Sequence, residues 1–235
     1  MQKEDIINKC LKKAGGTYLE IGVEHGVSMR SVRAQQKWGV DPTIALSQNS
    51  FVNAVKKRLA CLSGIRYFEM TSDDFFERND DLLQKSKIGV ALIDGAHSYE
   101  QSLRDVNHCL KYLHGEGILV MHDCNPSSEV MATSAPSFEE AMEKVPRGSS
   151  RAWTGDVWKT IVHLRSFRHD LAICVMDCDY GVGLVKRGKA EAALNLSPEK
   201  IRDMTYHDLK THRKELLNLK APELIDDVLK EMFSA

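Results

Sequence analysis

The sequence has little of what marks several specialised classes of protein. Its 32 Lys and Arg residues are balanced by 33 Asp and Glu residues, so the formal net charge is −1. This balance gives no electrostatic reason to expect nucleic acid or an anionic membrane as the main partner. No apolar stretch approaches the length of a membrane span, and the amino-terminal residues lack the apolar core of a signal peptide. We therefore expect a cytoplasmic protein that binds neither nucleic acid nor a membrane.

Cysteine is also sparse, and its spacing is uninformative. The six cysteines are scattered, mostly inside apolar stretches. The closest pair, Cys174 and Cys178, is weak evidence for zinc because no second pair accompanies it. Reduced and partly buried thiols are the expected state.

The glycine patterns of two common nucleotide-binding loops are missing as well. The stretch 17–23, "TYLEIGV", is followed by a turn with glycines at 22 and 26, and Glu24 stands where a dinucleotide fingerprint has its middle glycine. The stretch "GVSMR" does not supply the lysine and hydroxyl that follow the last glycine of a phosphate-binding P-loop. A nicotinamide oxidoreductase is therefore disfavoured.

What the sequence does have is an alternation of apolar runs of strand length with helical stretches. This pattern predicts a parallel sheet covered by helices on both faces. Strands are expected at 17–23, 37–42, 65–72, 88–95 and 117–124, and helices at 28–36, 50–62, 73–84, 98–113 and 155–167. Two further strands at 170–177 and 181–187, joined by a tight turn, should be antiparallel.

The regular pattern is interrupted once and changes near the end. Residues 125–152 contain three prolines, many serines and one short helical patch, so we expect a functional loop or lid. After Gly188 the sequence becomes helical and charged, with a helix start at Ser197–Pro198 and another at Pro222. The expected organisation is a helix at 1–14, one α/β domain at 15–188 and a helical extension at 189–235.

Polar residues follow each of the first five expected strands. In open α/β sheets the ligand binds beyond the carboxyl ends of the strands. Turn-forming residues also occur there for structural reasons, but five polar strand ends in succession favour a binding site. These strand ends carry Glu20 and Gly22, Asp41, Thr71 to Asp73, Asp94 to His97, and His122 with Asp123.

Two of these acids indicate the kind of ligand. Glu20 would repel a pyrophosphate but suits a ligand with an ammonium group, such as a nucleoside that carries an amino acid. Asp41 follows the second strand about twenty residues later, where an acid accepts hydrogen bonds from ribose hydroxyls.

With these residues, the sequence resembles the class I S-adenosylmethionine-dependent methyltransferases. The matching stretches, in order, are "LEIGVEHGVS", "WGVDP", "FEMTSDDFF", "IGVALIDGAHSYEQSLRDV" and "GILVMHDC". The resemblance covers about residues 15 to 188 and is strongest to small-molecule O-methyltransferases such as those of macrolide sugars, some of which use a divalent metal. It implies a Rossmann-like, seven-stranded, mostly parallel sheet with an antiparallel last strand.

The resemblance also implies roles for individual residues. Glu20 and Gly22 would bind the methionine part of S-adenosylmethionine, and Asp41 the ribose. Ser72 and Asp73 would contact the edge of the adenine, and Asp94 would lie beside the methionine and the methyl group. Gly26 belongs to the same cofactor turn. Glu24 departs from the glycine that is common in the family.

Each of the remaining candidate residues could have a purely structural role instead of a role in binding or catalysis. Ser28 could bond the cofactor carboxylate or could simply cap a helix. His97 could be a base, a metal ligand or a helix-start residue, and function is favoured. His122 could simply be packed in the sheet, so Asp123 is the better candidate for a ligand-binding residue. Trp153 could line an acceptor pocket.

These residues suggest a catalytic arrangement. If the fourth and fifth strands are neighbours, Asp94 and Asp123 leave the sheet side by side, and His97 lies within one turn. Two carboxylates so placed could hold Mg²⁺ or another divalent cation, which would lower the pKa of an acceptor hydroxyl while His97 takes its proton. Asp94 could instead contact only the cofactor while Asp123 caps a turn.

The sequence thus predicts methyl transfer from S-adenosylmethionine to an oxygen of a small polyhydroxylated or glycosyl acceptor. The alternative is a cofactor-binding protein without transfer activity, acting as a partner or scaffold. The charged C-terminal helices would pack on the domain or on a second copy in a homodimer.

Overall fold

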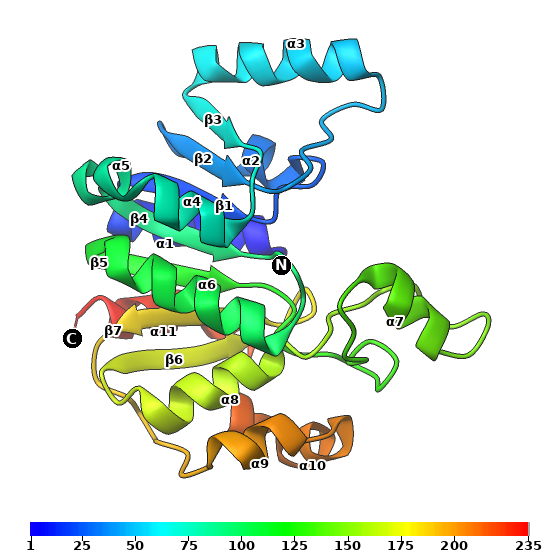
Figure 1. The fold of residues 1–235 in the computed structure, drawn as a ribbon. Coiled ribbons are helices and arrows are strands. Elements are labelled where there is room, and N and C mark those ends of the chain that lie inside the picture. The colour runs from blue at the N-terminus through cyan, green and yellow to red at the C-terminus, as the bar shows by residue number, and fades with distance from the viewer. Residues whose placement is uncertain (235) are drawn as a thin grey trace. The chain divides into compact units, whose positions relative to one another are not determined.

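The computed structural model describes residues 1–234 of the chain, whose fold is drawn in Figure 1. Backbone contacts group them into two compact units. We call Glu4–Gly95 with Asp105–Leu119 the amino-terminal unit, and Met1–Lys3, Ala96–Arg104 and the chain from Val120 onward the carboxyl-terminal unit.

The amino-terminal unit contains the parallel part of the sheet. Its strands lie in the order β3-β2-β1-β4-β5. Their bounds are β1 (Thr17–Ile21), β2 (Lys37–Val40), β3 (Ile65–Phe68), β4 (Ile88–Ile93) and β5 (Leu113–Met121), the last of which runs on into the other unit. Strand β1 pairs in parallel with both β2 and β4, and β2 pairs in parallel with β3. Every residue of β1 and β4 is buried, as their apolar sequences require of strands covered on two faces.

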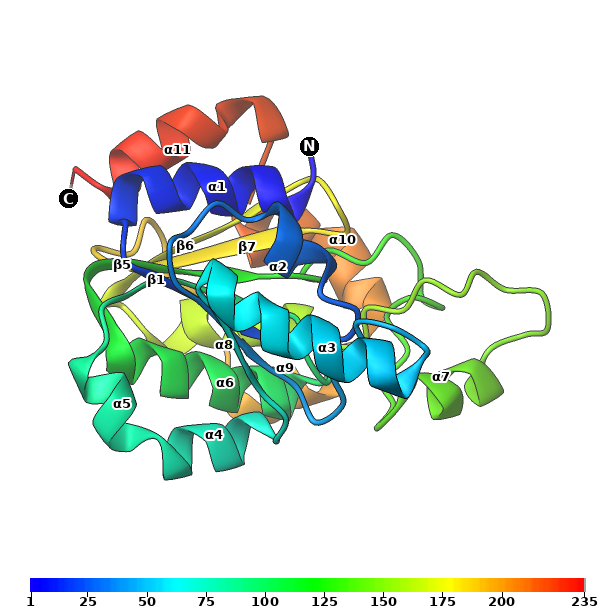
Figure 2. The same cartoon turned by 90° about the horizontal axis from the view of Figure 1, so that it is seen from above.

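Helices cover both faces of these strands. In Figure 2, α1 (Lys3–Ala14) and α2 (Val27–Ser31) lie on one side of β1, and α4 (Ser72–Arg78) and α5 (Asp80–Lys85) lie on the other. Aromatic stacking of Phe76 on His108 and Tyr112 joins α4 to the end of α6 (Tyr99–Tyr112). The helix expected at 73–84 is divided in two at Asn79, whose φ of −120° is not helical. The remaining helical segments of this unit are α3 (Ser50–Ala60) and η1 (Cys61–Ser63).

The carboxyl-terminal unit completes the sheet. The end of β5 is followed across the sheet by β7 (Val182–Arg187), β6 (Leu171–Met176) and β8 (Leu219–Lys220). Strands β6 and β7 are antiparallel, as expected, and the turn between them uses left-handed backbone at Asp179, Tyr180 and Gly181. The described sheet has eight strands rather than seven, because the two-residue β8 adds to β6 in parallel.

Helices make up the rest of this unit. Their bounds are α7 (Phe138–Lys144), α8 (Trp158–Phe167), α9 (Pro198–Asp203), α10 (Tyr206–Leu217), η2 (Pro222–Leu224) and α11 (Ile225–Met232). Ser197 caps α9 ahead of Pro198, as the sequence predicts. The sequence offers Thr154 or Asp156 as a cap for α8, and this expectation is wrong. No side chain caps that helix at Val157, because Thr154 donates to the carbonyl of Met131 and Asp156 accepts from the backbone of Tyr99.

The C-terminal helices bury their apolar faces within one chain. Leu209 and Leu217 of α10 are fully buried, and Ile225 and Leu229 of α11 are nearly so. This burial fits packing on the protein itself. The domain boundaries at residues 14 and 188 and the homodimer stay predictions.

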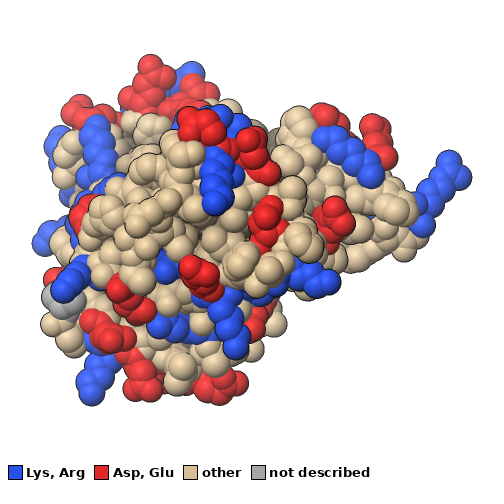
Figure 3. All heavy atoms as spheres, turned by 90° about the horizontal axis from the view of Figure 1, so that it is seen from below, with Lys and Arg blue, Asp and Glu red and all other residues tan. Residues whose placement is uncertain are grey.

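One face of the surface and the thiol chemistry are unremarkable in the part of the chain that the structure describes. Among these residues, no helix has the length and apolar character needed to cross a membrane. On the face drawn in Figure 3, basic and acidic side chains are interspersed. The cysteines are free thiols, and burial raises the pKa of Cys174 to about 12, which makes that thiol unreactive.

Candidate active site

The turn after β1 requires glycine at position 22. Gly22 has φ +91°, and a Cβ there would lie 2.0 Å from the carbonyl oxygen of Asp94. Its N–H donates to the carbonyl of Val40 at 2.9 Å, and the N–H of Asp94 donates to the carbonyl of Ile21 at 2.9 Å. The backbone therefore joins the carboxyl ends of β1, β2 and β4 at this one residue.

The rest of the turn keeps the backbone shape of a glycine loop although one glycine is replaced. Glu24 has φ +46°, in the left-handed region that non-glycine residues seldom adopt. Gly26 has φ +65° and is the N-cap of α2, and a Cβ there would lie 2.7 Å from Cδ2 of Leu46. Position 24 thus has a backbone conformation that glycine adopts more readily than glutamate.

Glu20, the acid that the sequence assigns to the cofactor, is buried at the end of β1. Glu20 is only 2% exposed. The hydroxyl of Tyr18, two residues earlier on the same strand, donates to Oε2 of Glu20 at 2.8 Å. Tyr18 has no exposed surface, and burial followed by the charge of Glu20 raises the pKa of its hydroxyl well above the usual value. Sequence reasoning did not identify Tyr18 as a partner of Glu20, although residues two apart on a strand lie on the same face of the sheet.

The carboxylate of Asp41 accepts hydrogen bonds from the backbone of the turn after β1. Its Oδ2 accepts from the backbone N–H of Val23 at 2.9 Å and of Glu24 at 3.0 Å. Its Oδ1 accepts from the N–H of Thr43 at 2.7 Å. The carboxylate after β2 therefore fixes the turn after β1, a role that sequence spacing could not show. Its contact with a ribose stays a prediction.

The hydroxyl of Ser28 is hydrogen-bonded to a residue of another helix. Ser28 is buried in α2, and its hydroxyl donates to Oε1 of Glu4 on α1 at 3.0 Å. It is not the cap of α2, since Gly26 holds that position. Its bond to the cofactor carboxylate stays a prediction.

Two predicted adenine contacts lie at the start of α4. Ser72 is the buried first residue of this helix, and Thr71 is its N-cap, accepting from the N–H of Asp74. Asp73 is more exposed, with its Oδ1 3.6 Å from Nε2 of His108. Both residues belong to the first turn of α4 rather than to the strand expected at 65–72, since β3 ends at Phe68, and their contact with adenine stays a prediction.

The carboxyl-terminal unit brings His97 and Asp123 together. Nδ1 of His97 lies 3.3 Å from Oδ2 of Asp123 and 3.0 Å from the carbonyl oxygen of Trp153. The ring of Trp153 stacks on that of His97, with centroids 5.0 Å apart. Asp123 is only 4% exposed, and both His97 and Asp123 have left-handed backbone, with φ of +50° and +61°. Left-handed backbone at residues other than glycine is uncommon and is found in turns and at functional sites.

The segment after the loop holds this pair in place. Gly155 has φ +59°, and a Cβ there would lie 1.8 Å from the carbonyl oxygen of His97. Asp156 accepts from the N–H of Tyr99 at 2.8 Å. Residues 153–156 therefore enclose 97–99, a contact across more than fifty residues that the sequence did not reveal.

A second imidazole lies behind Asp123. Nδ1 of His122 is 3.3 Å from Oδ1 of Asp123, and its Nε2 is 3.6 Å from Oδ1 of Asp179. Burial alone would raise the pKa of Asp179, but His122 and the N–H of Lys3 lower it below its usual value. His122 is buried, as the sequence suggested, but it also contacts two carboxylates.

Asp94 lies at the end of the amino-terminal unit. Its backbone forms the β4 side of the turn at Gly22. Its predicted role at the methyl end of the cofactor, and its pairing with Asp123 around a metal, stay predictions.

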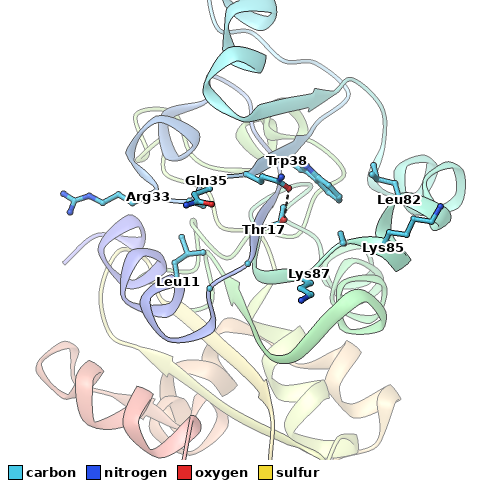
Figure 4. Close-up of a pocket in the computed structure, with 13 residues that line it drawn as sticks. Leu11, Thr17, Arg33, Gln35, Trp38, Leu82, Lys85 and Lys87 are labelled. Atoms are coloured by element: carbon cyan, nitrogen blue, oxygen red, sulfur yellow. Dashed lines mark hydrogen bonds between the residues drawn. The ribbon is translucent and has the colours of Figure 1, made fainter.

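A cavity of about 640 Å³ lies elsewhere in the amino-terminal unit (Figure 4). It is at the amino ends of the strands, with Thr17, Trp38 and Lys87 among its lining residues. None of the predicted site residues lines it. Ligands of open α/β sheets bind at the opposite ends of the strands, so this cavity is not the candidate site.

Comparison with known proteins agrees with the fold. Residues 19–124 match a family model described as a methyltransferase domain. A search of curated proteins finds no match. A methyltransferase from Podospora anserina bound to S-adenosylhomocysteine is 12% identical, with a TM-score of 0.55, over 78% of this chain and 76% of that one. An O-methyltransferase from Bacillus cereus in complex with S-adenosylhomocysteine is 10% identical, with a TM-score of 0.53, over 79% and 80%.

A third similar structure is a TDP-rhamnose 3′-O-methyltransferase of calicheamicin biosynthesis. It is 11% identical, with a TM-score of 0.50, over 80% of this chain and 78% of that one. The chain therefore has the fold of the class I S-adenosylmethionine-dependent methyltransferases. The match of residues 19–124 to a methyltransferase domain agrees with the enzyme class that the sequence predicts.

Proposed function

We propose that this chain transfers a methyl group from S-adenosylmethionine to a hydroxyl oxygen of a small polyhydroxylated or glycosyl acceptor. The methyltransferase domain and the fold support the cofactor. The acceptor class is supported by the similar structure whose name gives a deoxysugar nucleotide as its substrate. The observation that carries the proposal is the His97–Asp123 pair, because methylation of a hydroxyl needs a group that removes its proton.

The amino-terminal unit supplies the cofactor half of the site. Glu20 offers a carboxylate to the ammonium group of the cofactor, and the turn at Gly22 and Gly26 lets the ligand approach the backbone. Asp41, Ser72 and Asp73 follow β2 and β3, where ribose and adenine groups bind in this proposal, and Ser28 lies in the helix that opens after the turn.

The carboxyl-terminal unit supplies the base. A carbonyl oxygen and a carboxylate oxygen, both of which accept hydrogen bonds, lie beside Nδ1 of His97. The neutral ring therefore carries its proton on Nδ1, which leaves the lone pair on Nε2. Nε2 would take the proton of the acceptor hydroxyl while bound S-adenosylmethionine would supply the methyl group, with S-adenosylhomocysteine as the leaving group that keeps the electron pair of the broken S–C bond.

Chain connectivity limits how far the base can be from the cofactor turn. Asp94 forms one side of the turn at Gly22, and His97 follows it by three residues. Three residues span at most about 11 Å even when fully extended.

A divalent cation is the second part of this proposal. Asp94 and Asp123 follow β4 and β5, which are neighbours in the sheet. Asp123 is buried, and carboxylate oxygens are the ligands that a hard cation such as Mg²⁺ prefers. Asp94 and Asp123 would hold the ion, which when bound would lower the pKa of the acceptor hydroxyl.

In this proposal, residues 136–152 are the part of the acceptor lid that moves. The segment before them is fixed, because Arg213 donates to the carbonyl of Pro126 and Tyr206 to the carbonyl of Ser127. Nε1 of Trp153 also donates to the carbonyl of Thr133. Helix α7, in contrast, stands away from the remainder of its unit in both ribbon views (Figures 1 and 2).

The proposal is tested by binding and by transfer. Calorimetry should show that S-adenosylhomocysteine binds and NAD does not. S-adenosylmethionine labelled in its methyl group should then transfer label to at least one member of a panel of sugars, sugar nucleotides and phenols. Binding of S-adenosylhomocysteine without transfer to any acceptor would favour the scaffold, and binding of NAD would overturn the cofactor.

A further inference from the structure

Helix α3 presents its apolar face to the surface rather than to the sheet. Apolar side chains recur along α3 and η1 at spacings of three and four, which places them on one side of the helix. They form a strip that is 76% exposed at Phe51, 39% at Val52, 40% at Val55, 55% at Leu59 and 85% at Leu62. No residue of α3, all of which the structure describes, is buried. A helix that covers a sheet has the reverse orientation, with its apolar side inward.

Polar contacts attach the other side of α3 to the amino-terminal unit. Nδ2 of Asn53 donates to the carbonyl of Ile44 at 2.9 Å. Nζ of Lys57, four residues later on the helix, lies 2.5 Å from Oε1 of Glu69, which follows β3. In Figure 1, α3 lies beyond β3, the edge strand of the sheet. These contacts fix the orientation of the helix and hold its apolar strip outward.

Such a strip needs a partner. A helix of 11 residues is only marginally stable in water unless its apolar face is packed against something. Contiguous apolar surface on a folded protein commonly marks a site for another protein or for a membrane. The strip is the outer side of one helix at the sheet edge, so it is a ridge and not a groove. A ridge of this kind suits a surface that deforms around it, as a lipid bilayer does.

The charges around the strip indicate the chemistry of the partner. The segment 42–68 contains four basic residues and no acidic one, the basic residues being Lys56, Lys57, Arg58 and Arg66. Lys56 and Arg58 are exposed, and their places on the helix put them on either side of the strip. The net charge of the whole chain, −1, conceals this local positive charge. The expectation that no membrane is bound, which rests on the net charge, therefore does not apply to α3.

These charges also decide between the partners. Two copies of α3 packed face to face would bring Lys56 and Arg58 of both copies together, and the segment 42–68 has no carboxylate to pair with them. An anionic bilayer complements both features of the helix. Its acyl chains accept the apolar strip, and its head groups attract the flanking cations.

We propose that α3 and η1 form a peripheral membrane site, through which the chain binds the surface of bilayers that contain anionic lipids. The helix lies in the plane of the interface and does not cross the bilayer. The apolar strip enters the outer part of the hydrocarbon, and Lys56 and Arg58 stay at the level of the head groups. This inference is independent of the proposed methyl transfer.

Sedimentation with lipid vesicles tests the apolar strip. The wild-type protein should sediment with vesicles of phosphatidylcholine and phosphatidylserine, and should bind much less to phosphatidylcholine alone. Phe51→Ser combined with Leu62→Ser should weaken binding to the anionic vesicles by about tenfold or more, because two inserted apolar side chains are lost. Leu224→Ser, at an exposed apolar position of η2, is the matched control and should bind as the wild type does.

Charge reversal tests the cations. Lys56→Glu combined with Arg58→Glu should weaken binding to the anionic vesicles by about tenfold or more, since two attractive charges become repulsive. Lys12→Glu combined with Lys13→Glu makes the same change of charge at exposed positions of α1 and should keep wild-type binding. Binding of the wild type should also fall as salt is raised. Thermal melting of every variant should match the wild type, because each substituted side chain is exposed.

Several results would overturn the proposal. They are a wild-type protein that does not bind anionic vesicles, equal binding to neutral and anionic vesicles, and equal losses in the control variants. A dimer in analytical ultracentrifugation that Phe51→Ser with Leu62→Ser dissociates, without vesicle binding by the wild type, would assign the strip to a second copy. Binding to polyglutamate but not to vesicles would assign it to an acidic protein.

Discussion

Nδ1 of His97 lies 3.3 Å from Oδ2 of Asp123, although the two residues follow different strands of the sheet. The carbonyl of Trp153 adds a second acceptor at 3.0 Å from the same nitrogen. Both contacts fix one tautomer of the imidazole and one orientation of its ring. This arrangement, rather than the presence of a histidine as such, is what suits His97 to accept a proton.

Replacing the base should lower turnover and leave cofactor binding intact. His97→Ala is expected to lower kcat for the methylated acceptor by about 10²–10⁴-fold, the usual contribution of a general base. Its affinity for S-adenosylhomocysteine, measured by calorimetry, should not change. His169→Ala, at an exposed position near the start of β6, is the matched control and should have wild-type turnover. Wild-type turnover in His97→Ala would remove the base from the mechanism.

Chelation tests the cation. Treatment with EDTA should abolish methyl transfer to the accepted substrate, and added Mg²⁺ should restore it. Asp123→Asn should show reduced recovery with Mg²⁺, because an amide is a weaker ligand for a hard cation than a carboxylate. Full activity in chelator would exclude the metal while leaving the His97–Asp123 pair as the catalytic unit.

Asp41 should contribute to stability as well as to binding. Asp41→Ala leaves three backbone N–H groups without their acceptor, so we expect the free energy of unfolding to fall by about 1–2 kcal/mol in the absence of ligand. Asp41→Asn keeps one side-chain oxygen and should lose less. Urea denaturation measures both values, and calorimetry should show weaker binding of S-adenosylhomocysteine. Unchanged stability in both variants would contradict the anchoring role.

The lid should be cut in one part only. Limited proteolysis of the free protein should cleave within 136–152 and spare 125–135, which Arg213 and Tyr206 hold through backbone carbonyls. Cofactor together with an acceptor should protect 136–152 and change the fluorescence of Trp153, whose ring stacks on His97. Equal cleavage with and without ligands would indicate a static insertion.

The sequence by itself determined the order of the elements and where the polar residues lie along the chain. Buried strands such as β4 need continuous apolar runs, and "IGVALI" cannot be confused with an exposed segment. Local chemistry also set the helix start at Ser197–Pro198. The same patterns placed Glu20, Asp41 and Asp94 at strand ends, since a parallel sheet leaves its polar residues there.

Only the tertiary structure decided what each of these side chains contacts. The N–H groups that Asp41 accepts, the Trp153 carbonyl beside His97 and the close approach of Gly155 join segments far apart in the sequence. No local propensity encodes such contacts, because they depend on how loops return over the sheet. Tyr18 is the intermediate case: its period of two with Glu20 is visible in the sequence, but the hydrogen bond depends on burial of both residues, which the covering helices provide.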